Sequence, residues 1–378
     1  MNKLIFRKLS IDIFSFFLLS SIAITSIVWV IQGVNLLDIV SEQGHGLKVY
    51  FFYSILNIPK IFSKLLIFTY FLTLFVVLLK YEENNEILVF WTNGIKKITF
   101  INFIGKISIV FVLIQLFLTL IVVPYTQNLK QEYLKSSTIE FFPKLIKEKK
   151  FSNLNKNLTI FVEQNKKDGF LEGIYIKEKI NNNESKIIIA KEGMLINDKD
   201  VEGVNFKLKD GNITNIKKKE SINLKFQESV YQLSKNNSSI RQVNKLNEIK
   251  SSFLFFCLNK FLKDRKDSEL RCGIKNSFLI KDIYEEIFKR TINPIYIIIL
   301  SLISSLLIVK PKTSFLEKYF KFLLFILGFL IILFSELSYK FIYFTNLLEI
   351  TFILLPAAFV FFFYFILLIK TKFKVSYL

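Results

Sequence analysis

Six long apolar segments, three before and three after a polar stretch with strand-like patterning, constrain the fold of this chain more than any other feature. They cover residues 11–31, 61–79, 98–123, 292–309, 320–337 and 347–369. Each is close to or above the roughly 20 apolar residues that a helix needs to cross about 30 Å of hydrocarbon. Lipid offers the backbone no hydrogen-bonding partners, so these segments are expected to be helices. The sequence therefore predicts a polytopic α-helical membrane protein with six transmembrane helices in a 3+3 arrangement.

The composition separates this chain from several functional classes. Hydrophobic residues make up 52% of the sequence and 43 of its 378 residues are phenylalanine, which is rare in water-soluble domains. A net charge of +20 could indicate nucleic-acid binding, but the lysines are spread through loops and strands and form no compact stripe. We therefore expect this charge to face a membrane surface, and we expect no nucleic-acid partner.

The sequence lacks the common catalytic and metal-binding motifs. His45 is the only histidine, which excludes Ser–His–Asp hydrolases and HExxH metalloproteases. No GxxxxGK[ST] segment occurs, so ATP hydrolysis by this chain is not expected. Cys257 and Cys272 lack CxxC spacing and a histidine partner, which argues against a zinc site. They could pair in an oxidising compartment, but two incidental thiols are the favoured interpretation. The sequence predicts no enzyme activity, no metal site and no cofactor bound by this chain.

Lysine and arginine in the short loops indicate the orientation, because these residues collect on the cytoplasmic side. Four segments on one side of a six-span topology are basic: the N-terminus, the loop between spans 2 and 3, the loop between spans 4 and 5, and the C-terminal tail. Their basic residues are Lys3, Arg7, Lys8, Lys80, Lys96, Lys97, Lys310, Lys312, Lys318, Lys321, Lys370, Lys372 and Lys374. Both termini are therefore expected in the cytoplasm, and the polar insert on the opposite side of the membrane.

The insert between the two sets of spans has the pattern of an all-β domain. Short apolar–polar alternating runs at 158–163, 171–177, 185–190, 205–208 and 222–227 are separated by turn-forming segments. Asp-Gly pairs at 168–169 and 210–211 predict hairpin turns. We expect an antiparallel sandwich, a jelly roll or an open β-groove, with helical connectors at about 126–150 and 239–289 on either side.

The loop between spans 2 and 3 is the segment most expected to carry function. Residues 86–91 have the pattern of a short amphipathic helix, with Glu86 at its N-terminal end and Gly94 ending it. One interpretation is an interfacial helix that Trp91 anchors in the lipid surface. The other is a coupling helix at about 82–95 that docks an apolar face into a groove of a cytoplasmic motor protein.

Three sequence segments resemble the LptF/LptG permease family of lipopolysaccharide transport, and the resemblance covers essentially the whole chain. After span 2, NEILVFWTNGI matches the family's loop at Glu86, Ile87, Gly94 and Ile95, whereas Trp91 and Thr92 depart from it. NLTIFVEQNKKDGFLEGIYIKEK in the insert is similar to a strand pair of the family and leans toward the LptF-like branch. Glu286, Arg290 and Pro294 match the E-x-x-x-R-x-x-x-P segment before span 4.

The resemblance implies one half of a permease pair in an ABC exporter of the bacterial inner membrane. The implied partners are a cytoplasmic ABC ATPase dimer that uses the ATP, a second homologous permease, and periplasmic bridge proteins with a β-jelly-roll fold. The implied substrate is lipopolysaccharide, which is extracted from the inner membrane and passed through a periplasmic jelly-roll-like domain towards the outer membrane. The residues implied to couple the chain to the ATPase are Glu86, Ile87, Leu88, Phe90, Trp91 and Gly94.

Basic residues at the outer ends of the spans are candidates for binding lipid phosphates: Lys48, Lys60, Lys64 and Lys340. Lys60 and Lys64 could instead extend to the membrane interface without binding a headgroup. Family members often have basic residues at the outer end of span 1, where this chain has Gln32, Asn35 and Asp38.

The predicted domains are residues 1–124 (spans 1–3 with the coupling helix), 125–290 (the β domain and its connectors) and 291–378 (spans 4–6 and a short tail). Three alternatives remain open. One is a membrane-anchored sensor or scaffold with a periplasmic β domain, which leaves six spans unexplained. Another is a permease for a different lipid. The third is an ABC permease of the type with one span, a periplasmic domain and three further spans, which the 3+3 arrangement disfavours.

Overall fold

The computed structural model describes residues 2–37, 47–145, 148–155, 158–166, 170–181, 184–196, 205–217, 220–232, 246–263, 280–309, 317–338 and 346–372. The chain divides into two compact units. The helical unit contains Met1–Ile31, Leu56–Asn128 and Asn244–Leu378, and the sheet unit contains Gln32–Ile55 and Leu129–Val243. Each unit is described separately below.

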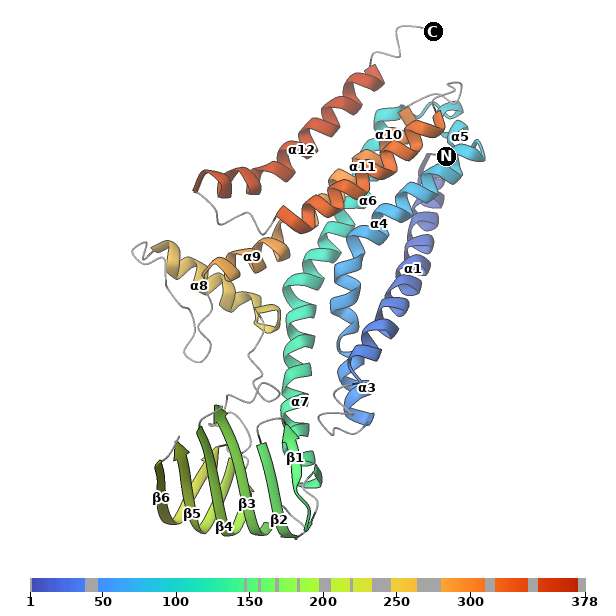
Figure 1. Ribbon diagram of the computed structural model, residues 1–378. Coiled ribbons are helices and arrows are strands. Elements are labelled where there is room, and N and C mark those ends of the chain that lie inside the picture. Colours follow the sequence, from blue (N-terminus) through green and yellow to red (C-terminus); the bar gives the residue numbers. More distant parts are fainter. Residues whose placement is uncertain are drawn as a thin grey trace. The chain divides into compact units, whose positions relative to one another are not determined.

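The long helices confirm the expected spans. The helices are α1 (Asn2–Asn35), α3 (Leu47–Ile55), α4 (Ile58–Glu83), α5 (Glu86–Thr92), α6 (Lys97–Phe117), α7 (Val123–Leu145), α8 (Ser251–Lys263), α9 (Ile280–Thr291), α10 (Tyr296–Val309), α11 (Glu317–Ser338) and α12 (Asn346–Lys372) (Figure 1). Six helical stretches of the described residues are long and apolar enough to cross a membrane: Lys3–Asn35, Leu47–Glu83, Lys97–Leu134, Lys281–Ile308, Tyr319–Ser338 and Leu354–Thr371. The protein is therefore a helical membrane protein with a β domain inserted between its third and fourth spans.

Helix α10 is the packing centre of the helical unit. It packs against α4, α6, α11 and α12, and almost all of its side chains are buried. Its buried Ser304 and Ser305 donate to the carbonyls of Leu300 and Ser301, which satisfies both hydroxyls inside the apolar core. The outer helices α1, α11 and α12 instead expose many large apolar side chains, as expected of surfaces that face lipid or another membrane subunit.

A π-helical turn, Leu118–Val122, joins α6 to α7 and interrupts the regular backbone pattern of span 3. Such turns are rare and leave backbone carbonyls available to other partners. Here the carbonyl of Leu120 accepts a hydrogen bond from Ser251 at the start of α8, with a donor–acceptor distance of 2.7 Å. The irregular turn is therefore a contact point between span 3 and the connector that leads to span 4.

The sheet unit contains one six-stranded antiparallel sheet in which each strand pairs with its neighbours in sequence (Figure 1). The strands are β1 (Ser152–Asn155), β2 (Leu158–Asn165), β3 (Phe170–Asn181), β4 (Glu184–Ile196), β5 (Asn205–Lys217) and β6 (Glu220–Gln232). This next-neighbour order is that of a meander, which agrees with the open form among the expected β folds. The five predicted strands correspond to β2–β6, and β1 was not predicted.

The sheet curls so that one face forms its own core. Alternate side chains of β2, β3, β4 and β5 are buried on this face, including Ile160, Ile176 and Phe206. Tyr231 on β6 donates a hydrogen bond of 2.5 Å to Glu178 on β3, although these strands are not neighbours in the sheet. Burial, and then this carboxylate, raise the pKa of Tyr231. The curled sheet therefore encloses an apolar interior without a second sheet in the described residues.

The Asp-Gly pair at 210–211 does not form the predicted hairpin turn. Both residues lie inside β5, where Asp210 has a left-handed φ of 49° and interrupts the pairing with β4. A Cβ added at Gly211 would lie 2.4 Å from the carbonyl oxygen of Ile189, so glycine is needed for close approach of the strands. The prediction was wrong because a left-handed residue inside a strand and a hairpin turn favour the same residue types. The other pair, at 168–169, lies outside the described residues, but β2 and β3 on either side of it pair as a hairpin.

Candidate functional site

Helix α5, in the loop between spans 2 and 3, is held by a left-handed residue at each end. Asn85, with φ of 60°, precedes the helix, and Gly94, with φ of 74°, follows it. The amides of Gly94 and Ile95 donate to the carbonyls of Trp91 and Phe90, each at 3.0 Å, which is a Schellman C-cap. The prediction that Gly94 ends this helix is confirmed. A seven-residue helix thus has a fixed direction relative to the spans on either side.

The inner face of α5 anchors the helix to the cores of spans 1 and 3. Ile87 and Phe90 are buried, and Phe90 is only 1% exposed. The ring of Phe90 lies edge-on to Phe100 of α6 at a centroid distance of 4.9 Å and lies 5.6 Å from Phe6 of α1. Such aromatic pairs contribute about 0.5–1.5 kcal/mol beyond the area they bury. Any force on α5 would therefore be transmitted directly to α1 and α6.

The outer face of α5 is also apolar. Leu88 and Val89 are 55% and 47% exposed. Trp91 is half-buried between the faces, 6.0 Å from the ring of Phe100, and Lys97 lies 5.9 Å from its indole ring. Sequence analysis did not single out Val89. The buried Ile87 and Phe90 are three residues apart, as on one face of a helix, so the apolar residues at 88 and 89 could have been assigned to an outer face.

Glu86 forms an ion pair at the N-terminal end of α5. Its carboxylate lies 3.1 Å from the ammonium of Lys8 on α1. The hydrogen bond from Lys8 holds the pKa of Glu86 below its usual range. On the neighbouring helices, Glu82 of α4 and Lys321 of α11 form a more buried pair at 3.2 Å. The end of the helical unit that carries α5 is thus held together by charged contacts between three spans and the loop.

Arg290 is the most connected buried cation of the described helical unit. It is 4% exposed and pairs with Glu286 one turn earlier on α9, at 2.9 Å. It also donates to the carbonyls of Leu246 and Ile249 and to the hydroxyl of Ser251. The carbonyl of Arg290 accepts a 2.9 Å hydrogen bond from Thr119 in the π-helical turn. The Glu286–Arg290 motif therefore joins the connector from the β domain to the start of span 4 and to span 3.

The four candidate headgroup lysines do not form one cluster in the described residues. Lys60 and Lys64 lie one turn apart on α4, where Lys60 is half-buried and Lys64 is exposed. Lys48 is exposed on α3 in the sheet unit, and Lys340 lies outside the described residues. Only Lys60 and Lys64 are therefore brought together.

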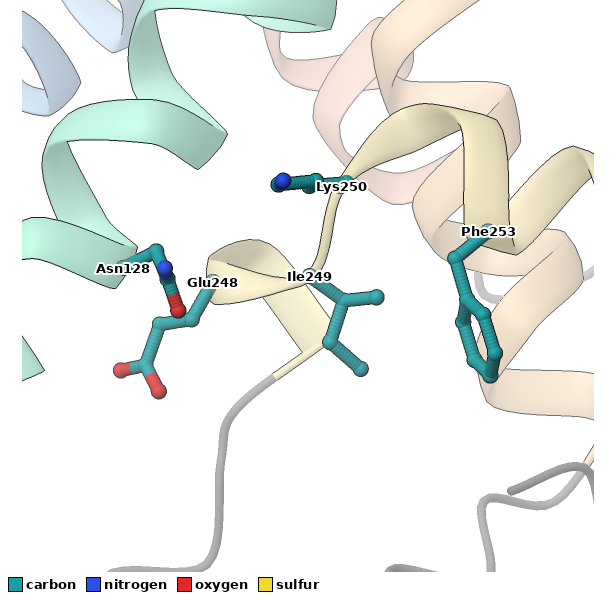
Figure 2. Close-up of a pocket in the computed structure, with 5 residues that line it drawn as sticks. All are labelled: Asn128, Glu248, Ile249, Lys250 and Phe253. Carbon is teal, nitrogen blue, oxygen red and sulfur yellow. The ribbon is translucent and has the colours of Figure 1, made fainter. Parts of the chain in front are cut away.

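Helix α8 borders a cavity and carries a disulfide-bonded cysteine. A cavity of about 270 Å³ is bordered by Asn128, Glu248, Ile249, Lys250 and Phe253 (Figure 2). It lies where the connector enters α8. Cys257 on α8 is disulfide-bonded, so the interpretation of incidental thiols was wrong. The other cysteine of the sequence, Cys272, lies outside the described residues.

Comparison with known proteins identifies the family. The family model for the lipopolysaccharide export system permease LptF/LptG matches residues 9–370 of the chain. The chain belongs to this family. The model covers both branches, so an LptF-like assignment stays a prediction. The chain is also similar to the uncharacterized protein RP871 of Rickettsia prowazekii (strain Madrid E), with 24% identity over 248 residues. That match covers 63% of this chain and 65% of the Rickettsia protein, just under two thirds of its length.

Membership in the LptF/LptG family agrees with the geometry described above. LptF/LptG proteins are permeases, that is, transport subunits of the membrane, and the six spans and inserted β domain of this chain have the organisation that the resemblance implied. The two segments through which the sequence resembled the family outside the sheet are α5 and the α9 segment around Arg290. Both make contacts that connect separate spans, which gives a physical reason for the residue types found there.

Proposed function

We propose that this chain is one permease subunit of an ABC exporter that extracts lipopolysaccharide from the inner membrane and passes it towards the outer membrane. The observation that carries the proposal is the family match over residues 9–370, supported by the two-faced helix α5. A cytoplasmic ABC ATPase dimer supplies the energy, a second homologous permease completes the membrane pathway, and periplasmic β-jelly-roll proteins receive the lipid.

The outer face of α5 is the docking site for the ATPase in this proposal. Leu88 and Val89 present exposed apolar surface and Glu86 supplies a charge beside them. An amphipathic helix in a groove is a common recognition mode for such a surface. Ile87 and Phe90, which were also expected to couple, act from the inside by fixing α5 to α1 and α6. When the ATPase closes, α5 moves and the attached spans shift between two packed arrangements.

In this proposal α5 lies in the cytoplasm and the β domain lies in the periplasm. The lysine-rich short loops support this orientation. The disulfide at Cys257 supports it independently, because disulfides persist in oxidising compartments such as the periplasm and are rare in the cytosol. The apolar interior of the curled sheet suits acyl chains, whose burial contributes about 0.8 kcal/mol per CH₂ group.

Purification of the tagged chain in mild detergent, followed by mass spectrometry of its partners, tests the proposal. We expect an ATPase and a second six-span permease to co-purify with the wild type. Glu86→Arg should lose the ATPase, whereas Glu192→Arg, the same charge reversal at an exposed residue of β4, should retain it. Purification of the chain without partners, or an ATPase that binds Glu86→Arg as well as wild type, would overturn the proposal.

A further inference from the structure

Helix α8 has one covered apolar face, and on its other side it exposes three phenylalanines together with the polar Ser252, Asn259 and Lys260. Leu254 and Cys257 on the inner face are buried against Ile283 and Ile287 of α9. On the outer side Phe253, Phe255 and Phe256 are exposed, and Phe256 is 65% exposed. Figure 2 shows the ring of Phe253 extending from the start of the helix. A connector helix in water would carry polar residues at these positions.

The outer boundary of the membrane can be located independently from two spans. Helix α6 is 21 residues long and ends at Phe117, so a span that starts at Lys97 crosses the hydrocarbon within α6. Span 4 ends at Val309, and about 20 helical residues are needed to cross the hydrocarbon, so this span enters the hydrocarbon close to Arg290. These two boundaries meet in the structure, because Thr119 donates to the carbonyl of Arg290 at 2.9 Å. The extracytoplasmic edge of the hydrocarbon therefore lies close to Thr119 and Arg290.

Helix α8 begins at this edge. The hydroxyl of Ser251, its first residue, donates to Leu120 at 2.7 Å and accepts from Arg290 at 2.8 Å. In Figure 1, α8 runs across the direction of α4 and α6 rather than along it. Span 3 carries a stripe of exposed apolar side chains that extends to this edge of the membrane. The stripe has one residue at every fourth position: Leu113, Phe117, Ile121 and Tyr125. Helix α8 thus begins at the level that the lipid-facing stripe of span 3 reaches.

We propose that α8 is an interfacial helix whose three exposed phenylalanines insert into the headgroup–acyl boundary of the outer leaflet of the membrane. Aromatic side chains favour this layer, and an amphipathic helix buries its apolar side about 5–10 Å into it. Lys250 and Lys260, both exposed at either end of the aromatic cluster, match anionic headgroups. The partner is the bilayer itself, and the proposal does not depend on the exported substrate. The helix holds the connector of the β domain at a fixed depth.

Tryptophan quenching in the full-length chain tests this proposal. The native Trp29 and Trp91 are replaced by phenylalanine, and Phe256→Trp is introduced as the single reporter. The protein is reconstituted in vesicles of phosphatidylcholine and phosphatidylglycerol, with or without bromine on the acyl chains near the headgroup. Leu113→Trp, on the lipid-facing side of span 3, is the control for insertion, and Phe170→Trp, exposed on β3, is the control for a position in water.

We expect brominated lipid to quench Phe256→Trp to an extent comparable with Leu113→Trp, and to leave Phe170→Trp unquenched. Quenching of Phe256→Trp by aqueous iodide but not by brominated lipid would place α8 in water and overturn the proposal. Protection from both quenchers would show that protein covers this side of the helix, and would overturn it equally. Because the vesicles contain no lipopolysaccharide, quenching by lipid reports the bilayer and not a bound substrate.

Discussion

Arg290 shows how a single buried charge can join the connector around Leu246 and Ser251 to the start of span 4. Its guanidinium donates to a carboxylate, a hydroxyl and two backbone carbonyls, all within 3.0 Å. Removing one partner of a buried ion pair is costly because the other charge remains buried and uncompensated. Sequence alone identified Glu286 and Arg290 as a motif, but their partners Ser251 and Leu246 lie about 40 positions away and have no pattern that links them to Arg290.

Replacement of Arg290 by methionine should destabilise the chain by about 3–5 kcal/mol, because Glu286 and the carbonyls of the connector lose their donor. The measurement is the unfolding midpoint of the purified protein in detergent. Lys281→Met, at the opposite end of α9, removes a charge without this network and should change stability by less than about 0.5 kcal/mol. Equal effects of the two substitutions would contradict the role given to Arg290.

The ion pair between Lys8 and Glu86 predicts a small pH dependence. Because the pKa of Glu86 is lowered in the folded protein, the pair contributes stability above the ordinary carboxyl pKa, and this contribution is lost as the pH falls through the lowered pKa. Both side chains are partly solvated, so the effect should stay below about 1 kcal/mol. Unfolding midpoints of wild type and Lys8→Met should therefore differ at neutral pH and converge in acid. A difference that is constant with pH would argue against the pair.

Among the helices, the approach of α11 to α4 depends on a glycine. A Cβ added at Gly328 would lie 2.1 Å from the ring of Phe71, a residue buried in the core of the helical unit. The ring must move, and overpacking of this kind typically costs about 1–3 kcal/mol. Gly105 in α6 offers a matched control, because a Cβ there meets nothing within 4 Å.

Gly328→Ala should lower the thermal midpoint, whereas Gly105→Ala should raise stability by about 0.5–1 kcal/mol through helix propensity. The opposite signs separate close packing from a general effect of glycine in helices. Replacing the ring of Phe71 with the smaller side chain of leucine should relieve the clash. Gly328→Ala combined with Phe71→Leu should therefore lower the free energy of unfolding by less than the sum of the two single changes. Additive losses would show that α11 and α4 do not meet at this position.

Secondary structure was predictable where one physical requirement dominates. The six spans were predictable because a helix must be long and apolar enough to cross the hydrocarbon layer. Strands β2 to β6 were predictable because apolar and polar residues alternate along strands that bury one face of the curled sheet. The Asp-Gly pair at 210–211 was misassigned because pairing with β4 and β6 on both sides keeps it inside a continuous strand. The outer face of α5 and the exposed phenylalanines of α8 also required the structure, since only packing separates the covered from the exposed apolar residues of each helix.

At the scale of the whole molecule, the described contacts form a continuous path from α5 to the connector that carries α8. Helix α5 is fixed to α1 and α6, α6 continues into the π-helical turn, and that turn bonds to Arg290 and Ser251. Each link joins elements that are far apart in sequence. If the proposed ATPase moves α5, this path carries the movement to the connector, and α8 limits its displacement relative to the lipid surface.

The distribution of lipopolysaccharide between membranes after depletion of the chain tests the proposed function most directly. In the source bacterium, inner and outer membranes would be separated after depletion, with rescue by wild type or by Glu86→Arg. We predict that lipopolysaccharide accumulates in the inner-membrane fraction, and that wild type restores its export whereas Glu86→Arg does not. An unchanged distribution of lipopolysaccharide in depleted cells would contradict the proposal, and accumulation of a different lipid in its place would identify a permease for that lipid.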